Sequence, residues 1–463
     1  MHRRELLKKL MAGLPGAALL PGFLTSCSKE LVPGEISFDG EVIIVGAGIA
    51  GLYAARILSE NGIRFKILEA SGRIGGRISS NSAFSDIPVE TGALKIRGQR
   101  SVFYDLVSRY ASEAPFRNDT GAYYLYQNQI REEFYIRTAG DLAGRGETLF
   151  QMIDSLGSYP GSEKSLKQYL IDFPINESLH GIANALVGNA NGSDSESLGM
   201  FALKESVAAR SAGLHSFALK SGSFSQLLQS AFPAEINQVA FNQVVNSIDY
   251  SGSQIEVTTT NNELHTSDAV ILTVPLSVLK NNSITFVPEL PVNKSNSIQA
   301  IGFGKAITVN LKFSASFWNS ETSAIYGGNI CPEYLVSSKG KDTGDFVLTG
   351  YLCGASATAM DSLTDQQIAD ALLAELSAMY PGMGVNTLFT GQYLVKNWSS
   401  DPFIQGGVSY PSPESKGQRV ALAESISGKL FFAGEACNVN GHEGTVHGAM
   451  ETAYIAVASI LNS

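Results

Sequence analysis

Cysteine and tryptophan are scarce in this 463-residue chain, which has four cysteines and two tryptophans. Cys27, Cys331, Cys353 and Cys437 lie far from the short spacings of metal-binding motifs and are too few for a disulfide framework. Cys331 and Cys353 could pair in an oxidising compartment, but single buried thiols are the simpler expectation. The sequence therefore predicts no metal centre.

An excess of basic residues is also absent. The chain has 33 Lys and Arg against 43 Asp and Glu, for a net charge of −10, which argues against a nucleic-acid partner. Beyond the N-terminal segment, no stretch approaches 18 unbroken apolar residues, so we expect no membrane-spanning helix. No nucleophile elbow accompanies a serine, histidine and aspartate, which leaves hydrolysis unsupported. The 46 glycines and 44% hydrophobic content fit a large α/β enzyme.

The first 27 residues resemble an export signal. Arg3-Arg4 precede a moderately apolar stretch, close to the twin-arginine pattern, and the stretch ends in LTSC (24–27), which resembles a bacterial lipobox. The resemblance implies lipidation of Cys27 and a protein anchored to a membrane of the bacterial cell envelope. The alternative is a cytosolic protein whose basic and apolar start is fortuitous.

A dinucleotide-binding fingerprint follows. Residues 42–45 form a short apolar run, Gly46, Gly48 and Gly51 open a helix with apolar periodicity, and a second strand (64–68) ends at Glu69. Glycines let the backbone approach a pyrophosphate at the helix N-terminus, and the acid accepts a ribose hydroxyl. The predicted cofactor contacts here are Gly46, Gly48, Ile49, Ala50, Gly51 and Glu69.

The residues after this acid point to a flavin. Glu69-Ala70, Arg73 and Gly75-Gly76-Arg77 resemble the ExxxRxGGR extension of the monoamine oxidase and L-amino acid oxidase superfamily. Two glycines allow a tight turn over a dinucleotide, and an arginine can pair with phosphate bidentately. The resemblance implies that Ala70 and Arg77 contact FAD, while Arg73 either contacts it or lies on the surface.

Two later segments resemble the same family. Residues 244–248 and 254–260 predict a hairpin, followed by a buried strand within 267–279, and the resemblance implies that Val245 contacts adenine through its backbone. Residues 429–461 predict a strand and then a helix, similar to the FAGE…GxxxGA segment. There the family places Glu435 near the ribityl phosphate and Gly444, Thr445 and Val446 along the isoalloxazine. A helix N-terminus near Thr445 would stabilise negative charge on the reduced flavin.

The predicted fold is α/β, with a discontinuous Rossmann-like FAD-binding domain and an α+β substrate-binding domain. The FAD-binding domain comprises residues 39–100, 225–290 and 418–463, and the substrate domain comprises 101–224 and 291–417. We expect a helical block over 101–219 and a mixed sheet over 301–410.

The segment from Glu90 to Ile96 is similar to the GxMR stretch of amino acid oxidases, whose arginine anchors the substrate carboxylate. Lys95 stands in that position and could hold a carboxylate as a point charge. It could instead neighbour a phosphate or be solvated. Gly92, Ala93, Leu94 and Lys95 are predicted to contact the cofactor as well.

Three further positions bear on substrate and cofactor. The resemblance implies that Trp398 packs near the flavin, and that Val408 and Thr445 stand where amine oxidases have two aromatic side chains around the substrate nitrogen. That aromatic cage is therefore expected to be absent, and a simple arylalkylamine is a less favoured substrate. Gly407 stands where some members carry the cysteine bonded to flavin, so FAD is predicted to be non-covalent.

Thr308 aligns with the family lysine that holds a water at flavin N5 and assists reaction with oxygen. Lys305 is three residues away, an odd offset that places it on the opposite face of a strand. His447 is either a base for an ammonium substrate or a structural histidine, and its spacing of five from His442 disfavours a pair on one helix face.

The resulting hypothesis is an FAD-dependent oxidoreductase that oxidises the C–N bond of an amine or L-amino acid to an imine. Catalytic residues are not assigned, and the predicted substrate contacts are Lys95, Thr308, Trp398, Val408, Thr445 and His447. One alternative is a dehydrogenase or desaturase of the same fold that passes electrons to a quinone or a protein rather than to oxygen. Another is a flavin-binding lipoprotein without turnover.

Overall fold

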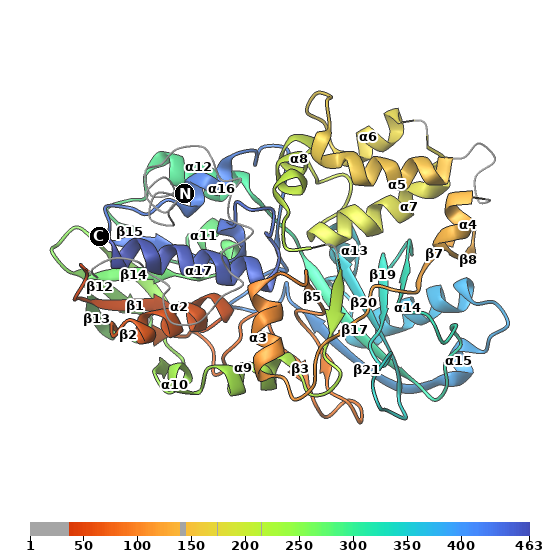
Figure 1. Cartoon of the computed structure of the whole chain (residues 1–463), viewed down its shortest axis with the longest axis horizontal. Helices are drawn as coiled ribbons and strands as arrows, with labels where there is room; N and C mark the ends of the chain where they lie inside the picture. Colours follow the sequence, from red (N-terminus) through yellow and green to blue (C-terminus); the bar gives the residue numbers. More distant parts are fainter. Residues whose placement is uncertain (1–36, 139–144, 174, 214) are drawn as a thin grey trace, which may run out of the picture.

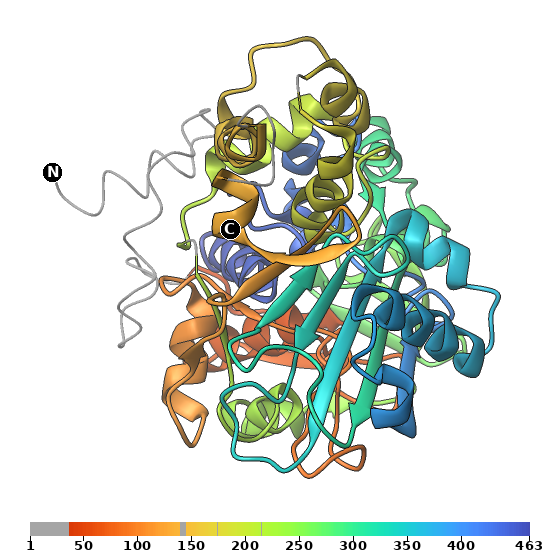
Figure 2. The ribbon, with the colours of Figure 1, turned by 90° about the vertical axis from the view of Figure 1, so that its right-hand side faces the viewer.

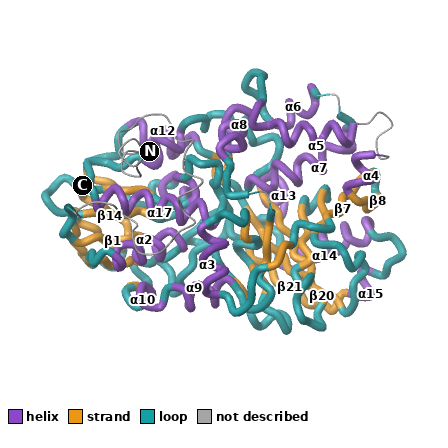
Figure 3. Tube along the Cα trace, in the orientation of Figure 1, coloured by secondary structure: helices purple, strands orange, loops and turns teal. Residues whose placement is uncertain are grey.

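The computed structural model describes residues 37–138, 145–173, 175–213 and 215–463. Arg3-Arg4 and Cys27, on which the export prediction depends, lie outside these residues. The strands gather in two groups, one at each end of the elongated molecule, with helices between and above them (Figures 1 and 3). No helix within the described residues is both long and apolar enough to cross a membrane.

A five-stranded parallel sheet forms the first group, with the order β10-β2-β1-β14-β23. Its strands are β1 (Glu41–Val45), β2 (Arg64–Leu68), β10 (Val239–Ala240), β14 (Ala269–Leu272) and β23 (Leu430–Phe432). Strands from three separate stretches of chain thus pair in one sheet, the arrangement expected for a discontinuous Rossmann-like domain. The precise domain limits remain a prediction.

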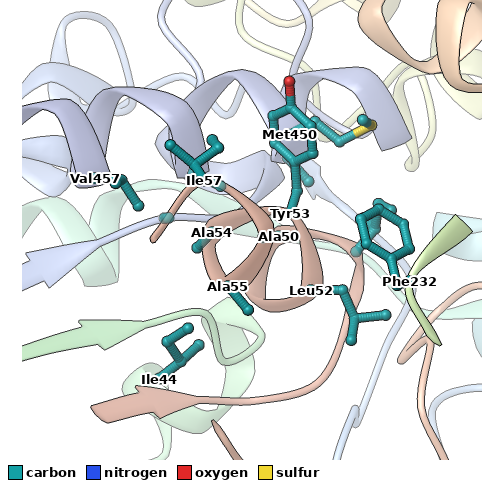
Figure 4. Close-up of a cluster of buried hydrophobic side chains, with 14 of the residues drawn as sticks. Ile44, Ala50, Leu52, Tyr53, Ala54, Ala55, Ile57, Phe232, Met450 and Val457 are labelled. Carbon is teal, nitrogen blue, oxygen red and sulfur yellow. The ribbon is translucent and has the colours of Figure 1, made fainter. Parts of the chain in front are cut away.

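Two long helices cover one face of this sheet: α2 (Ile49–Glu60) and α17 (Val446–Leu461). They pack against each other through small and aliphatic side chains, with Ile57 beside Val457 and Tyr53 beside Met450 (Figure 4). Small residues such as Ala54 let the two helices approach closely. Helices α3 (Val102–Tyr110), α9 (Phe224–Ala231) and α10 (Pro233–Ile236) extend the same core.

The turn from β1 into α2 depends on its glycines. Gly46 has φ of +110°, a conformation that favours glycine. A Cβ on Gly51 would lie 2.0 Å from the carbonyl oxygen of Gly46, so only glycine fits where the helix crosses the strand end. Because larger side chains would clash here, the glycines of the fingerprint determine where α2 begins.

The other face of the parallel sheet packs on a four-stranded sheet of order β13-β12-β11-β15. Its strands are β11 (Val245–Asp249), β12 (Ile255–Thr259), β13 (Leu264–Ser267) and β15 (Thr285–Val287). The predicted hairpin is confirmed by the antiparallel pairing of β11 with β12. Helices α11 (Leu276–Lys280), α12 (Val292–Ala300) and α16 (Gln418–Ala423) complete this side.

A seven-stranded mixed sheet forms the second group, with the order β21-β17-β20-β19-β18-β7-β8. The strands are β7 (Ala122–Tyr126), β8 (Gln129–Glu132), β17 (Ala306–Phe313), β18 (Ala324–Tyr326), β19 (Glu333–Val336), β20 (Phe346–Cys353) and β21 (Phe389–Asn397). Helices α13 (Gly354–Met360), α14 (Asp365–Met379) and α15 (Val385–Leu388) follow β20, and α14 supplies apolar side chains to the core of the sheet.

The stretch predicted as a helical block is partly sheet, which corrects that expectation. It contains helices α4 (Glu133–Thr138), α5 (Arg145–Ser155), α6 (Leu166–Asp172), α7 (His180–Ala183) and α8 (Met200–Ala209). It also donates β7 and β8 to the mixed sheet, because the alternating tyrosines of AYYLY pair with β18. In the turned view these helices lie above the mixed sheet (Figure 2).

Short strand pairs join the two groups. They are β3 (Ser80–Asn81) with β4 (Val89–Glu90), β16 (Gly302–Phe303) with β22 (Ser409–Tyr410), and β9 (Ser216–Ala218) between β5 (Ile96–Arg97) and β6 (Phe116–Arg117). Cys331, Cys353 and Cys437 are all buried free thiols, so the first two do not form a disulfide.

Candidate active site

A cavity of about 440 Å³ runs from the end of the parallel sheet to the mixed sheet. Most of the predicted contact residues line it, although they come from segments up to about 400 positions apart in sequence. They are Gly46, Gly48, Ile49, Ala50, Glu69, Ala70, Arg77, Gly92, Ala93, Leu94, Lys95, Val245, Trp398, Val408, Glu435, Gly444, Thr445, Val446 and His447.

Glu69 lies at the carboxyl end of β2 and is 8% exposed. Its Oε2 accepts a hydrogen bond from the backbone N–H of Ala47 at 2.7 Å, and its Oε1 accepts from Ser71 N at 2.8 Å and Ser71 Oγ at 2.6 Å. A carboxylate has about four acceptor sites. Glu69 therefore braces the glycine loop and retains capacity for a further donor.

Arg77 and Glu435 form an ion pair in the middle of the cavity wall, with Arg77 Nη1 2.8 Å from Glu435 Oε1. The same Arg77 nitrogen donates to the carbonyl of Gly407 at 2.8 Å. Glu435 also accepts from Ser409 Oγ at 2.7 Å and from Gly444 N at 2.8 Å. Burial alone would raise the pKa of Glu435, but the charges of Arg77 and Arg419 outweigh burial and lower the pKa.

The N-terminus of α17 opens on the cavity. Thr445 caps the helix, because its Oγ1 accepts from Gly448 N at 3.0 Å and donates to the carbonyl of His442 at 2.6 Å. His447 follows in the first turn and is 2% exposed. Burial, the neighbouring His442 and the charge of Arg97 hold the pKa of His447 well below its usual range, so its ring is neutral.

His442 and His447 do come together, with ring centroids 4.7 Å apart, because His442 lies in the loop that precedes α17. With Glu451 they form a group whose potential ligand atoms lie within 4.8 Å, close enough to hold a metal ion. The sequence did not predict this group. Both ring nitrogens of His442 are already engaged, Nδ1 with Glu451 at 2.9 Å and Nε2 with Ser211 N and Ala212 N at 3.2 Å. These hydrogen bonds explain why the side chains of His442 and Glu451 lie together.

Lys95 is not solvated, as one of its predicted alternatives would require. Its ammonium forms an ion pair with Glu333 of β19, which is 4% exposed and also lines the cavity. The positive charge predicted to meet a substrate carboxylate is therefore already neutralised by a carboxylate of the protein.

Trp398, Val408 and Gly407 lie together where β21 and β22 meet the cavity. Trp398 Nε1 donates to the carbonyl of Thr91 at 2.8 Å, which fixes its indole against the Gly92 segment. Val408 and Thr445 both line the cavity as non-aromatic side chains. Gly407 also lines it and offers no side chain that could bond a cofactor.

Three predicted positions lie elsewhere. Gly51 is buried beneath Gly46 and does not line the cavity, because its role is to let α2 cross β1. Arg73 donates to the carbonyls of Gly76 and Ile78 at 2.6 and 3.3 Å and also does not line the cavity. Thr308 is fully buried, its Oγ1 has no hydrogen-bond partner, and it is absent from the lining.

The physical reason for the position of Thr308 lies in the register of the mixed sheet. Thr308 is paired with Tyr351 on one side and Lys396 on the other. Ala306, two residues earlier on the same face of β17, is the residue that reaches the cavity. Lys305 points away as predicted and forms an ion pair with Asp361.

The comparisons with known proteins agree with this geometry. The family model described as flavin containing amine oxidoreductase matches residues 49–461. The chain belongs to this family. It is 28% identical over 428 residues to the human lysine-specific histone demethylase 2, covering 86% of this chain and 50% of that protein. It is 27% identical over 462 residues to polyamine oxidase 4 of Oryza sativa subsp. japonica, covering 94% and 89%.

Solved structures give the same fold. Cyclohexylamine oxidase from Brevibacterium oxydans superposes with a TM-score of 0.78 at 18% identity, covering 92% of this chain and 99% of that one. Putrescine oxidase bound to putrescine superposes with a TM-score of 0.78 at 19% identity, covering 92% and 100%. The chain spans about half the length of the histone demethylases that it matches.

The family implies FAD as cofactor, and the cavity fits it. A Cβ on Gly48 would meet no atom within 4 Å, so the start of α2 leaves room for a group to approach the backbone. That helix has neither an acid in its first turn nor a side-chain cap, so its N-terminal N–H groups can bind a pyrophosphate. Glu69, Arg77 and the capped N-terminus of α17 then follow along the same wall.

Sequence reasoning missed several residues that line this cavity, above all Arg97, Glu333, Tyr351 and Ala306. The strands of Glu333 and Tyr351 carry no motif, and only the register of the mixed sheet brings β19 and β20 to the cavity. Arg97 alone had a signal that could have been used. It lies two residues after Lys95, and alternate residues of an extended segment share one face.

Proposed function

We propose that this protein oxidises the C–N bond of an amine or amino acid to an imine, which water then hydrolyses. The observation that carries the proposal is the continuity of one cavity from the fingerprint loop to charged groups on β5 and β19. Bound FAD supplies the acceptor for a hydride equivalent from the carbon that bears the amine.

The protein's own share is positioning and electrostatics. The N-terminus of α17 stabilises negative charge that develops beside it. Neutral His447 adds no positive charge that would repel an ammonium substrate. Trp398, held by Thr91, and the side chain of Val408 narrow the cavity and exclude water from the reacting carbon.

Anaerobic mixing tests the proposal. Purified holoenzyme is titrated with a panel of amines and L-amino acids, and the visible absorbance of the oxidised flavin is followed. A substrate bleaches the flavin and yields an aldehyde or keto acid with ammonia. Persistence of oxidised flavin with every compound would contradict the proposal.

The identity of the electron acceptor is a second question, and one observation favours an acceptor other than oxygen. Ala306 reaches the cavity from β17, Thr308 is buried, and Lys305 is paired outside with Asp361. No lysine of β17 therefore lines the cavity to stabilise the charge that forms when oxygen is reduced. Rapid reoxidation by a quinone together with slow reoxidation in air would support this reading.

Export is also proposed. The twin-arginine-like start and the cysteine at position 27 support a lipid-anchored protein of the bacterial cell envelope. A pathway that moves folded cargo suits a protein that acquires FAD before transport.

A further inference from the structure

Among the residues that the structure describes, three cationic side chains line the cavity: Arg77, Lys95 and Arg97. Arg77 is paired with Glu435, and Lys95 is paired with Glu333. Within the described residues, Arg97 has no carboxylate at ion-pair distance. Its recorded hydrogen bond runs from Nη2 to the carbonyl of Ala190 at 3.3 Å, which leaves most of the five guanidinium N–H donors unused.

Glu333 pairs with Lys95 and not with Arg97. It is buried, Lys95 binds its Oε1, and the hydroxyl of Tyr326 is its second side-chain partner. Glu435, which also lines the cavity, accepts hydrogen bonds from Arg77 and Ser409. The carboxylates of this region are thus already assigned to other donors.

The strand geometry directs Arg97 to the same end of the cavity as Lys95. Ile96, between them, is fully buried, and residues 95 and 97 share the opposite face of the extended chain. Pairing of β5 with β9 holds this direction, because Arg97 is in register with Ser216. Arg97 is partly buried, and its charge is close enough to affect Tyr351 and His447, which line the same region.

His447 supplies a second unpartnered group. It is 2% exposed, and its Nε2 has no hydrogen-bond partner. A neutral imidazole can present this nitrogen as a donor. A guanidinium without a carboxylate partner and an imidazole nitrogen without a hydrogen-bond partner thus line one cavity, and both can donate to a ligand bound there.

We propose that Arg97 binds an anionic group of the substrate, namely the carboxylate of an amino acid or a similar carboxylated amine. A guanidinium matches a carboxylate through two parallel hydrogen bonds, and His447 Nε2 adds a third donor. Lys95, locked to Glu333, is a positioning residue for this end of the cavity. The inference rests on the proposed amine oxidation and names its substrate class.

Matched pairs of compounds test the inference on the holoenzyme. Each L-amino acid is compared with the amine that remains after loss of its carboxylate: phenylalanine with 2-phenylethylamine, leucine with 3-methylbutylamine, and ornithine with putrescine. The rate and half-saturation of anaerobic flavin reduction are measured for each compound. The wild-type protein is expected to favour the carboxylated member of at least one pair by tenfold or more.

Benzoate and benzamide give a readout that needs no turnover, because ligands beside the flavin shift its visible spectrum. Arg97→Met is expected to weaken benzoate binding by roughly 10- to 100-fold, the range for charge-assisted hydrogen bonds, and to leave benzamide unchanged. Arg97→Lys should restore part of the loss. Arg64→Met, on the exposed start of β2, is the matched control and should change neither ligand.

The outcomes separate two failures. If no compound of either type reduces the flavin, the proposed oxidation itself is wrong. If only uncarboxylated amines reduce it, or if Arg97→Met binds benzoate as tightly as the wild type, the oxidation stands and the role of Arg97 is wrong. Loss of FAD from folded Arg97→Met protein during dialysis would place Arg97 against the cofactor and also overturn the inference.

Discussion

Glu69 holds the glycine loop in shape and is also the residue predicted to accept a hydrogen bond from the ribose of FAD. Its carboxylate holds Ala47 N and Ser71 N, so the glycine loop keeps its shape only while this acid is present. We predict that Glu69→Ala weakens FAD binding by about 1.5–3 kcal/mol, or roughly 10- to 150-fold, the range for hydrogen bonds to a charged group. Flavin fluorescence during dilution and dialysis measures the loss.

Glu60→Ala provides the control, because Glu60 is exposed at the far end of α2. A Glu69→Ala protein that kept its full flavin content through dialysis would show that the glycine loop binds FAD without the Glu69 carboxylate. Acid precipitation of the wild type belongs to the same experiment, since non-covalent FAD stays in the supernatant.

Lys305, directly before β17, tests whether a lysine near this strand assists the oxygen reaction. Its ammonium is paired with Asp361 on the outer face of the strand, while Ala306 reaches the cavity. We therefore predict that Lys305→Met changes the rate of flavin reoxidation in air by less than about twofold, well below the roughly hundredfold loss typical of a preorganised charged group. Stopped-flow mixing of reduced enzyme with oxygen measures this rate, and a large fall would mean that Lys305 reaches the flavin.

At the scale of elements, Glu90 joins β4 to the start of α9. Its Oε1 accepts from Phe224 N at 2.9 Å, and its Oε2 accepts from Ser80 Oγ at 2.6 Å. Burial is the largest influence and raises the pKa of Glu90 from 4.5 to about 7, although both hydrogen bonds oppose the rise. The folded state thus holds this proton over a pH range in which the unfolded chain has lost it.

This difference in the pKa of Glu90 makes the stability of the folded protein depend on pH. Stability supplied by protonated Glu90 is complete below pH 4.5 and is lost as pH rises through about 7. We predict that Glu90→Gln removes this loss and gains about 1–3 kcal/mol relative to the wild type at pH 8, since one pKa unit corresponds to about 1.4 kcal/mol. Denaturant unfolding at pH 5 and pH 8 measures it, with Glu60→Gln as control. Parallel pH dependence in Glu90→Gln and the wild type would contradict the prediction.

Elements whose own residues show a steric or periodic pattern were predictable from the sequence. Elements that form only by pairing with a strand far away in the chain were not. Gly46 and Gly51 encode the β1–α2 turn through forbidden Cβ positions, and the FAGE segment encodes β23 and α17. Strand β7 was missed because its identity as a strand depends on β18, about 200 residues away. Glu333 was missed as a site residue for the same reason, because strand register and not local pattern brings it to the cavity.

At the scale of the whole molecule, the cavity exists only where the two groups of strands meet. The parallel sheet contributes the loops after β1, β2, β14 and β23, and the mixed sheet contributes Ala306, Glu333 and Tyr351. The cofactor-binding features therefore lie at the ends of the parallel strands and their helices, whereas the substrate end is built from side chains of the mixed sheet that differ in charge from strand to strand. This division explains why FAD follows from the family and the substrate must be tested.

The described chain begins away from this cavity. Ser37 N donates to the carbonyl of Leu461 at 3.2 Å, at the C-terminal end of α17, whereas Val446 and His447 at its N-terminal end line the cavity. A helix of 16 residues is about 24 Å long at 1.5 Å per residue. An anchor at Cys27 would thus join the folded protein at the end of α17 that is remote from the active site.

We predict that the lipid anchor can be removed without an effect on the active site. Replacement of Arg3-Arg4 by Lys-Lys should block export, and Cys27→Ala should move the exported protein from the membrane fraction to the soluble fraction, because the acyl chains supply the membrane affinity. FAD content and anaerobic reduction by substrate should be the same in the released and anchored forms, since the attachment point lies far from the cavity. Cell fractionation with immunoblotting measures the first effect. Cys27→Ala protein that still sediments with membranes after a high-salt wash would show that the cysteine is not the anchor.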